Sequence, residues 1–317
     1  MKALWFEAGR MELREMEPVS AKPGEALIDV VAVGICNTDL ELARGYMDFT
    51  GVPGHEFVGK VVFGPRELEG RMVVGEINIG CGCCEFCMRN QARHCPNREV
   101  LGIFKRQGAF AQQIALPVAN LHPLPDSVDA TVGVFVEPLA AALRIPEQIR
   151  IAPGVRMLLV GDGKLAQLIA RIMALYGVRL TVIGRHIKKL ALISPFAENT
   201  LLEKDFTDRE CFSIAVEASG KPTGLITAKR ALQPMGILVL KSTYAGNPEM
   251  DLSSFVVDEL TLMGSRCGPF APAIDLLKRN LVDPRPLVSA IYDFGDAAEA
   301  FQAASDRESL KIVVRME

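Results

Sequence analysis

The stretch Arg156–Gly177, RMLLVGDGKLAQLIARIMALYG, decides the fold. Its first residues, Arg156–Val160, form an apolar run that predicts a buried strand, and a glycine turn follows at Gly161–Gly163. The next segment, Lys164–Tyr176, repeats apolar side chains at helical spacing, and Gly177 stands where a glycine commonly ends a helix. A strand, a tight turn and a helix in succession predict the start of a parallel, doubly wound sheet.

The sequence downstream of this unit continues the alternation of apolar runs with helical or short connecting segments. A helix is predicted over Thr223–Leu232, before a turn at Pro234–Gly236. Further strands are predicted at Arg179–Ile183, Thr200–Leu202, Phe212–Val216, Ile237–Leu240 and Leu260–Met263. Together with the first strand they predict an α/β domain with a parallel sheet.

The sequence on either side of this region has a different character. Upstream, short strands punctuated by Gly and Pro indicate a β-rich domain, at Ala26–Val33, Val58–Val62 and Arg71–Ile77. A helix over Glu137–Arg144 leads into the α/β region. Beyond it, the remainder predicts helices around Ala271–Arg279 and Asp296–Ala304 and a last strand at Lys311–Arg315.

Composition limits the function classes. With 317 residues, 49% hydrophobic and 23% charged, the chain is long enough for two globular domains. A net charge of −3 argues against a dedicated nucleic-acid binder. No apolar run approaches the length of a membrane span, and Glu7 and Arg10 interrupt the N-terminus before a signal-peptide core could form. We therefore expect a cytoplasmic protein without nucleic-acid or membrane partners.

Five of the eight cysteines fall within fifteen residues. Four of them have the spacing C-x2-C-x2-C-x7-C, namely Cys81, Cys84, Cys87 and Cys95. Four thiolates at such spacings are typical of a closed, tetrahedral structural zinc site. A redox pair or a set of unligated thiols is the alternative, and Cys83 is expected to stay outside the metal site.

The glycine turn predicts a dinucleotide site because it has the form G-x-G-x-x-A between a strand and a helix. Gly161 permits the turn, Gly163 lets the backbone approach a pyrophosphate, and Lys164 and Leu165 open the helix whose N–H groups face the phosphates. The side chain of Asp162 is expected to point away from the diphosphate. The alternative is an ordinary strand–helix turn.

The end of the second strand of this domain predicts which dinucleotide is bound. NAD enzymes carry an acidic residue there for the ribose hydroxyls, whereas this chain has Gly184 followed by Arg185. Lys189 lies four residues beyond Arg185 and would share its face of a helix starting there. The pattern favours NADP, with NAD as second choice. A solvated basic helix start, or Arg185 stacked on the adenine of either cofactor, is the alternative.

A second metal site is indicated by residues scattered along the chain. Cys36, His55, Glu56 and Glu137 offer one thiolate, one imidazole and two carboxylates. Such a set can hold zinc and leave a coordination position open for a substrate. Each of these side chains could instead have a structural role.

The motifs GICNTDLEL, GHEFVGKVV, NIGCGCCEFC…HC, EPLA and GDGKLA occur in this order in the chain. In this it resembles the zinc-dependent alcohol dehydrogenases of the medium-chain dehydrogenase/reductase superfamily. The resemblance implies a GroES-like catalytic domain over residues 1–137 and 268–317, with a structural zinc lobe at 81–95. It also implies a Rossmann domain over residues 138–267 that binds NADP.

The resemblance also implies roles for individual residues. Cys36 and His55 match zinc ligands, and Glu56 and Glu137 match carboxylates that bind the zinc directly or through its water. Thr38 matches the hydroxyl that begins a proton relay. Asp39 matches the acid that orients the ligand histidine. Glu137, in place of a cysteine, is similar to the sorbitol, threonine and glucose dehydrogenase branch.

The expected function is hydride transfer between NADP and a polyol, sugar or secondary alcohol and its carbonyl product, in a homodimer or homotetramer. The rival hypothesis is a non-catalytic NADP-binding sensor or structural homologue. That rival predicts the loss of zinc ligands, yet all are present in the sequence. The zinc-free quinone reductase branch fits poorly because it lacks both metal motifs.

Overall fold

The computed structural model describes residues 1–207, 209–244 and 248–316. The chain divides into two units, Met1–Glu137 with Phe270–Glu317, and Pro138–Pro269. Within the described ranges, no helix combines the length and apolar character needed to cross a membrane.

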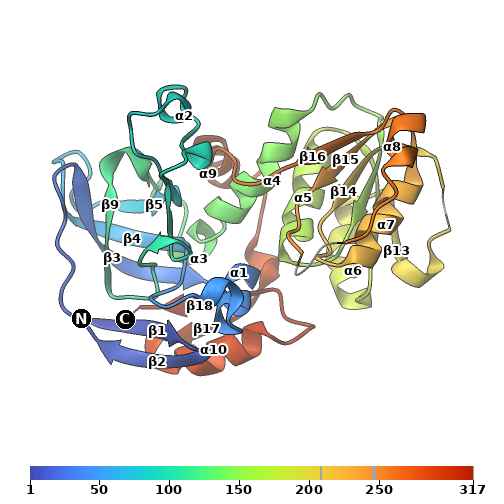
Figure 1. Cartoon of the computed structure of the whole chain (residues 1–317). Helices are drawn as coiled ribbons and strands as arrows, with labels where there is room; N and C mark the ends of the chain where they lie inside the picture. Colours follow the sequence, from blue (N-terminus) through green and yellow to red (C-terminus); the bar gives the residue numbers. More distant parts are fainter. Residues whose placement is uncertain (208, 245–247, 317) are drawn as a thin grey trace. The chain divides into compact units, whose positions relative to one another are not determined.

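The unit Pro138–Pro269 is built on a parallel sheet, six-stranded in the described part of the chain, in the order β13-β12-β11-β14-β15-β16. Helices pack on both of its faces (Figure 1). This confirms the predicted doubly wound sheet, with the strand of the glycine turn at its centre. The strands are β11 (Arg156–Val160), β12 (Arg179–Gly184), β13 (Asn199–Leu202), β14 (Phe212–Glu217), β15 (Leu232–Leu240) and β16 (Thr261–Gly264). The helices are α4 (Val136–Gln148), which begins in the other unit, α5 (Lys164–Leu175), α6 (Ile187–Ile193), α7 (Pro222–Ala231) and α8 (Ser253–Val257).

The start of β15 differs from the prediction. The expected turn at Pro234–Gly236 lies inside the strand, and α7 ends one residue before Leu232. Met235 has a φ of 63°, and the pairing of β15 with β14 shifts register between Phe212 and Ile214. An irregularity of this kind lets a strand continue past a proline that cannot donate to the ladder.

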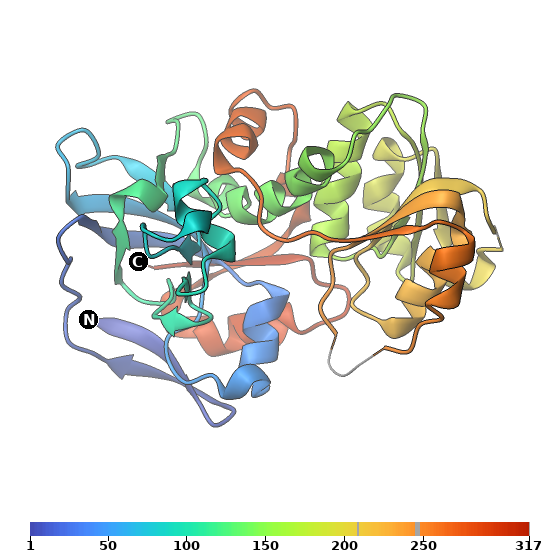
Figure 2. The same cartoon turned by 45° about the horizontal axis from the view of Figure 1, so that its top comes forward.

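The other unit holds a seven-stranded sheet in the described residues, in the order β10-β5-β4-β3-β18-β17, with β9 also paired to β3. The last strand of the chain pairs antiparallel with β3, so C-terminal residues complete an N-terminal sheet (Figure 2). The strands are β3 (Glu25–Gly34), β4 (Glu56–Phe63), β5 (Met72–Gly75), β9 (Gln113–Pro117), β10 (Leu121–Pro123), β17 (Val288–Asp293) and β18 (Lys311–Arg315).

Smaller elements surround this sheet, and several of them were not predicted. They include a hairpin of β1 (Lys2–Glu7) and β2 (Arg10–Glu15), a small sheet of β6 (Asn78–Ile79), β7 (Glu99–Leu101) and β8 (Lys105–Arg106), and the helices α1 (Asn37–Ala43), α2 (Glu85–Met88), α3 (Ala130–Gly133), α9 (Phe270–Lys278) and α10 (Ala297–Ala304). The helix α1 matters most for the site, because it begins directly after Cys36. Its seven residues are too few to show a clear helical period in the sequence.

Candidate active site and cofactor-binding turn

Cys36, His55 and Glu56 come together at one end of the seven-stranded sheet. Cys36 follows β3, and Glu56 begins β4, where it lies opposite Gly34 of β3. Among the described residues, Cys36, His55 and Glu56 form a group whose ligand atoms all lie within 4.8 Å of one another. A soft thiolate, an imidazole and a carboxylate are donors that suit zinc.

Asp39 positions the residues of this group. It is fully buried on α1, where one carboxylate oxygen accepts the backbone N–H of Cys36 at 2.8 Å and the other that of Gly54 at 3.2 Å. The second oxygen also lies 3.4 Å from Nδ1 of His55. At that distance and orientation Nδ1 makes no hydrogen bond to any described residue, and the contact is a charge interaction. Gly54 has a φ of 99°, which a glycine adopts without strain.

Glu56 forms a buried ion pair with Lys311, the first residue of β18. Both side chains are almost inaccessible to solvent, and the Nζ of Lys311 contacts Oε2 of Glu56. The same oxygen lies 2.7 Å from where a Cβ at Gly34 would stand, so a larger residue at this point of β3 would have to displace the Glu56 carboxylate. Sequence reasoning missed Lys311; the signal was a lysine followed by three apolar residues at the start of a strand.

The buried charges shift one another's protonation. Burial alone would lower the pKa of His55, but the neighbouring Asp39 carboxylate and Cys36 raise it well above its ordinary value. Burial likewise opposes the charged form of Lys311, yet Glu56, helped by Cys36 and Asp39, raises the pKa of that amine. Lys311 therefore carries a positive charge at neutral pH, beside the candidate ligands.

Thr38 and Glu137 lie at different places relative to this group. The Oγ1 of Thr38 is 3.9 Å from the sulfur of Cys36. Glu137 is half-buried in the first turn of α4. Its carboxylate is outside the group of donor atoms within 4.8 Å that the described residues form around Cys36. Of the two predicted carboxylates, Glu56 is therefore the one whose oxygen lies within 4.8 Å of the ligand atoms of Cys36 and His55.

The cysteine cluster forms a separate group around α2, which Figure 1 labels. The sulfur atoms of Cys81, Cys84, Cys87 and Cys95 all lie within 4.8 Å of one another. Backbone N–H groups of Cys83 and Cys84 lower the pKa of the Cys81 thiol to about 6, while desolvation raises that of Cys87 to about 12. The sulfur of Cys83 lies 3.6 Å from that of Cys81.

The glycine turn after β11 has the shape that its sequence predicts. Gly161 has a φ of 126°, and a Cβ there would lie 2.7 Å from the carbonyl oxygen of Ala218. A Cβ on Gly163 would meet nothing within 4 Å, so open space lies beside the start of α5. Lys164 and Leu165 form the first turn of that helix and are partly exposed. The backbone can therefore approach a bound phosphate closely, as the fingerprint requires.

The end of β12 departs from the prediction in two ways. The helix α6 begins at Ile187, so Arg185 precedes it and does not share a helical face with Lys189. Lys189 is only 7% exposed, whereas Arg185 is exposed. The carboxylate of Asp162 accepts the backbone N–H groups of Arg185 and His186, the two residues before the helix, at 2.7 Å each.

The guanidinium of Arg185 is held from two sides. Its Nε donates to Glu203 at 2.5 Å, and its Nη2 donates to the hydroxyl of Thr223 at 3.2 Å. Glu203 begins a short 3-10 helix, Glu203–Asp205, directly after β13, and Thr223 lies in α7. Neither partner was found by sequence reasoning, because each lies on a different strand–helix connection.

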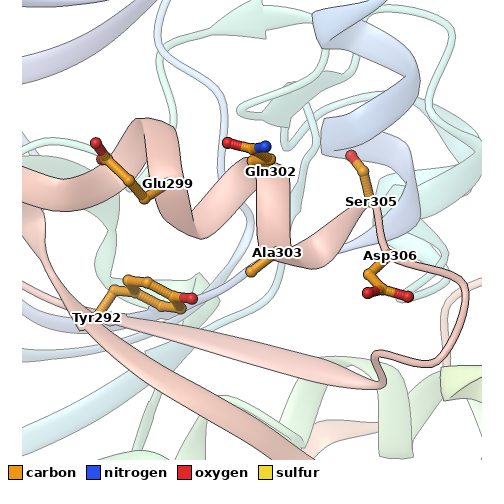
Figure 3. Close-up of a pocket in the computed structure, with 6 residues that line it drawn as sticks. All are labelled: Tyr292, Glu299, Gln302, Ala303, Ser305 and Asp306. Carbon is orange, nitrogen blue, oxygen red and sulfur yellow. The ribbon is translucent and has the colours of Figure 1, made fainter.

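A shallow depression of about 560 Å³ lies elsewhere, over α10 and β17 (Figure 3). Its lining residues are Tyr292, Glu299, Gln302, Ala303, Ser305 and Asp306. None of these is a predicted metal or cofactor residue. The depression is therefore separate from the candidate active site.

The chain is similar to several known proteins. Residues 22–126 match the family model of the alcohol dehydrogenase GroES-like domain. The chain is 31% identical over 277 residues to the L-threonine 3-dehydrogenase of Pyrococcus horikoshii, covering 80% of this chain and 78% of that protein. It is 26% identical over 305 residues to the L-idonate 5-dehydrogenase (NAD(P)(+)) of Escherichia coli K12, covering 89% and 88% of the two chains. The solved alcohol dehydrogenase TADH from Thermus sp. ATN1 superposes with a TM-score of 0.90 at 25% identity and covers both chains completely.

A GroES-like sheet carrying a thiolate–imidazole–carboxylate group, together with a doubly wound sheet carrying a dinucleotide fingerprint, defines an alcohol–carbonyl oxidoreductase. The chain belongs to the alcohol dehydrogenase branch of the medium-chain dehydrogenase/reductase superfamily. It is an enzyme of the NAD(P)-dependent alcohol dehydrogenase class.

Proposed function

We propose that this protein is a zinc-dependent dehydrogenase that transfers a hydride between NADP and a polyol, sugar or secondary alcohol and its carbonyl product. The observation that carries the proposal is that Cys36 and the buried His55 lie together, with the Glu56 carboxylate within 4.8 Å and Asp39 behind them. The donor set suits zinc, and Asp39 faces Nδ1 of His55, which leaves Nε2 for the metal.

Cys36, His55 and one carboxylate would hold the metal, with a fourth position left for substrate. When bound, zinc supplies Lewis acidity that stabilises an alkoxide. Because Lys311 is bound to Glu56, we propose Glu137 as the direct carboxylate ligand and Glu56 as an anion held back by Lys311. One thiolate and one carboxylate balance the charge of the metal, and the Glu56–Lys311 pair then adds no net charge.

Thr38 would begin the transfer of the substrate's proton. Its hydroxyl lies 3.9 Å from Cys36, next to the proposed metal position, and a hydroxyl can accept one proton while donating another. Asp39 keeps the N-terminus of α1 in place through the backbone of Cys36, which also fixes Thr38 in the first turn of that helix. These residues would prepare the alcohol for hydride transfer, for which a bound nicotinamide would supply the hydride acceptor.

The cysteine lobe would hold a second, structural zinc through Cys81, Cys84, Cys87 and Cys95. Four mutually close sulfur atoms leave no position for a substrate, which is the usual arrangement of a structural site. Cys83 would remain outside the coordination sphere.

The cofactor site would consist of Gly161, Gly163, Lys164 and Leu165 at the diphosphate, with Arg185 near the ribose. The support for NADP is the exposed guanidinium of Arg185 and the absence of an acidic side chain at position 184. Charge-assisted hydrogen bonds from Arg185 would contribute about 1.5–3 kcal/mol each, which corresponds to roughly ten- to a hundredfold preference over NAD. The buried position of Lys189 leaves it a lesser part in this preference than the sequence indicated.

We also propose that the protein forms a homodimer or homotetramer through the edge strand β16. Leu262 in this strand and Val256 and Val257 in α8 are exposed apolar side chains on the same unit. An exposed apolar edge strand is costly for a monomer unless it is covered. Sedimentation of the wild type at several concentrations measures the association directly.

The proposal is tested by metal analysis and by NADPH oxidation with a panel of ketones, ketoses and aldehydes. We expect about two zinc ions per chain and turnover with polyhydroxylated or secondary substrates. The variant Glu137→Gln should lose the catalytic zinc, while Glu56→Gln should retain it. Arg185→Ala should reduce the ratio of kcat/KM for NADP over that for NAD. A metal-free active enzyme, or an unchanged ratio in Arg185→Ala, would contradict the assignment.

A further inference from the structure

Asp162, the residue between the two glycines of the fingerprint, directs its carboxylate to the end of β12. Oδ2 accepts the backbone N–H groups of Arg185 and His186, each at 2.7 Å. Both oxygens lie 3.1 Å from Nδ1 of His186, which therefore carries its proton toward the carboxylate. The acid is thus fixed to a strand that it does not belong to.

The carboxylate occupies the space in which a side chain at position 184 would begin. A Cβ on Gly184 would lie 2.5 Å from Oδ2, 2.6 Å from Cβ and 2.8 Å from Cγ of Asp162. The backbone of Gly184 has no positive φ, so the glycine is required by this contact and not by its own conformation. Asp162 therefore fills the space next to the Cα of Gly184.

In NAD enzymes, an acidic side chain at the position of Gly184 accepts hydrogen bonds from the ribose hydroxyls. We propose that Asp162 supplies this carboxylate from the turn after the first strand, and so acts as a cofactor-specificity residue that favours NAD. This inference rests on the proposed function, in which the turn binds a dinucleotide.

The carboxylate has the capacity for this role. A carboxylate offers about four acceptor positions, and the contacts with Arg185 and His186 account for three of them. Its side chain keeps 9% exposure, and one acceptor position is left for a further donor. A ribose 2′-hydroxyl can donate to it, whereas a 2′-phosphate would meet a like charge.

Asp162 and Arg185 therefore act in opposite directions on the same 2′ position. Glu203 adds to the effect of Asp162, because it already binds the Nε of Arg185. A 2′-phosphate must compete with Glu203 for the guanidinium and approach a fixed carboxylate. The outcome is an enzyme in which NAD remains usable beside NADP.

The test is calorimetric binding of 2′,5′-ADP and 5′-AMP, which carry the adenosine ends of NADP and NAD. In Asp162→Asn, which keeps the size and removes the charge, affinity for 2′,5′-ADP relative to 5′-AMP should rise by about fivefold or more. Arg185→Ala is the matched control and should move the ratio the other way. Glu203→Gln should raise it by a smaller factor. An unchanged ratio in Asp162→Asn, or a shift toward 5′-AMP, overturns the inference.

A second variant keeps the inference testable if Asp162→Asn folds poorly. The double variant Asp162→Gly with Gly184→Asp removes the Cβ that obstructs position 184 and returns the acid to the second strand. Its affinity for 5′-AMP should equal that of the wild type. Its discrimination against 2′,5′-ADP should be at least as strong as that of the wild type. Loss of 5′-AMP binding in a folded double variant counts against the inference. A wild type that binds neither nucleotide would instead overturn the proposed function itself.

Discussion

The two groups of metal-ligating residues in this protein are built in opposite ways. The lobe of Cys81–Cys95 collects its four sulfur atoms from fifteen consecutive residues. The group of Cys36, His55 and Glu56 depends on Lys311, which lies 255 residues from Glu56 along the chain. The lobe sulfurs range from exposed to buried, whereas His55, Glu56 and Lys311 are buried. A local motif needs only its loop to form, while the distant one needs the completed sheet.

This contrast predicts that the two groups can be broken independently, and the largest effect is expected on catalysis. Cys36→Ala should reduce turnover by at least about a thousandfold and lower the zinc content from about two per chain to about one. Cofactor binding and the melting temperature should change little. Metal analysis, NADPH oxidation and calorimetry measure the three quantities.

The control for this variant is Cys211→Ser, which alters a cysteine outside both groups. It should leave metal content and turnover at wild-type levels. Retained activity in Cys36→Ala, or loss of both metals together, would show that the two groups are not independent.

Removing the distant partner should cost the most stability. Lys311→Met leaves the Glu56 carboxylate buried without its cation, which should lower the free energy of unfolding by about 3–5 kcal/mol. Urea denaturation measures the loss. Adding Glu56→Gln removes the uncompensated charge and should recover most of it. If the single variant were as stable as the wild type, the ion pair would not be holding β18 to β4.

A change in the cysteine lobe should affect stability and metal content but not turnover. Cys87→Ser removes one sulfur of the lobe and should lower the melting temperature by roughly 5 °C, with loss of about one zinc per chain. The kcat/KM should stay within about twofold, because the lobe is proposed to carry no catalytic group. Cys83→Ser is the matched control and should keep both metals. A collapse of turnover in Cys87→Ser with the lobe metal still bound would refute the separation.

The smallest effect is expected at the contact between Gly184 and Asp162, whose separation along the chain lies between those of the two metal-ligating groups. Gly184→Ala places a Cβ against the Asp162 carboxylate and should cost about 1–3 kcal/mol in the free energy of unfolding. The double variant with Asp162→Gly should recover that loss, since the obstructing side chain is gone. Thermal melts of the three variants give the comparison. Equal stability of Gly184→Ala and wild type would show that Asp162 moves aside freely.

Sequence reasoning succeeded where the information was local. The turn of Gly161 and Gly163 was predicted because a strand, a glycine pair and a helix stand next to each other, and the structure places them so. The helix start predicted after β12 was wrong: α6 begins at Ile187, and Asp162, from the turn after β11, binds the backbone N–H groups of the two residues before it. Arg185 is consequently exposed to solvent, whereas Lys189 is buried.

What the sequence by itself determined is the fold class, the family, the cysteine lobe and the dinucleotide turn, since each is written in neighbouring residues or in their periodicity. Tertiary structure alone decided that Lys311 faces Glu56, that Asp162 fills the space beside Gly184 and that Glu203 binds Arg185. The physical reason is that strand pairing and strand order set these contacts. Lys311 reaches Glu56 because β18 and β4 both pair with β3, and Glu203 reaches Arg185 because β13 pairs with β12. No periodicity within a single segment carries that information.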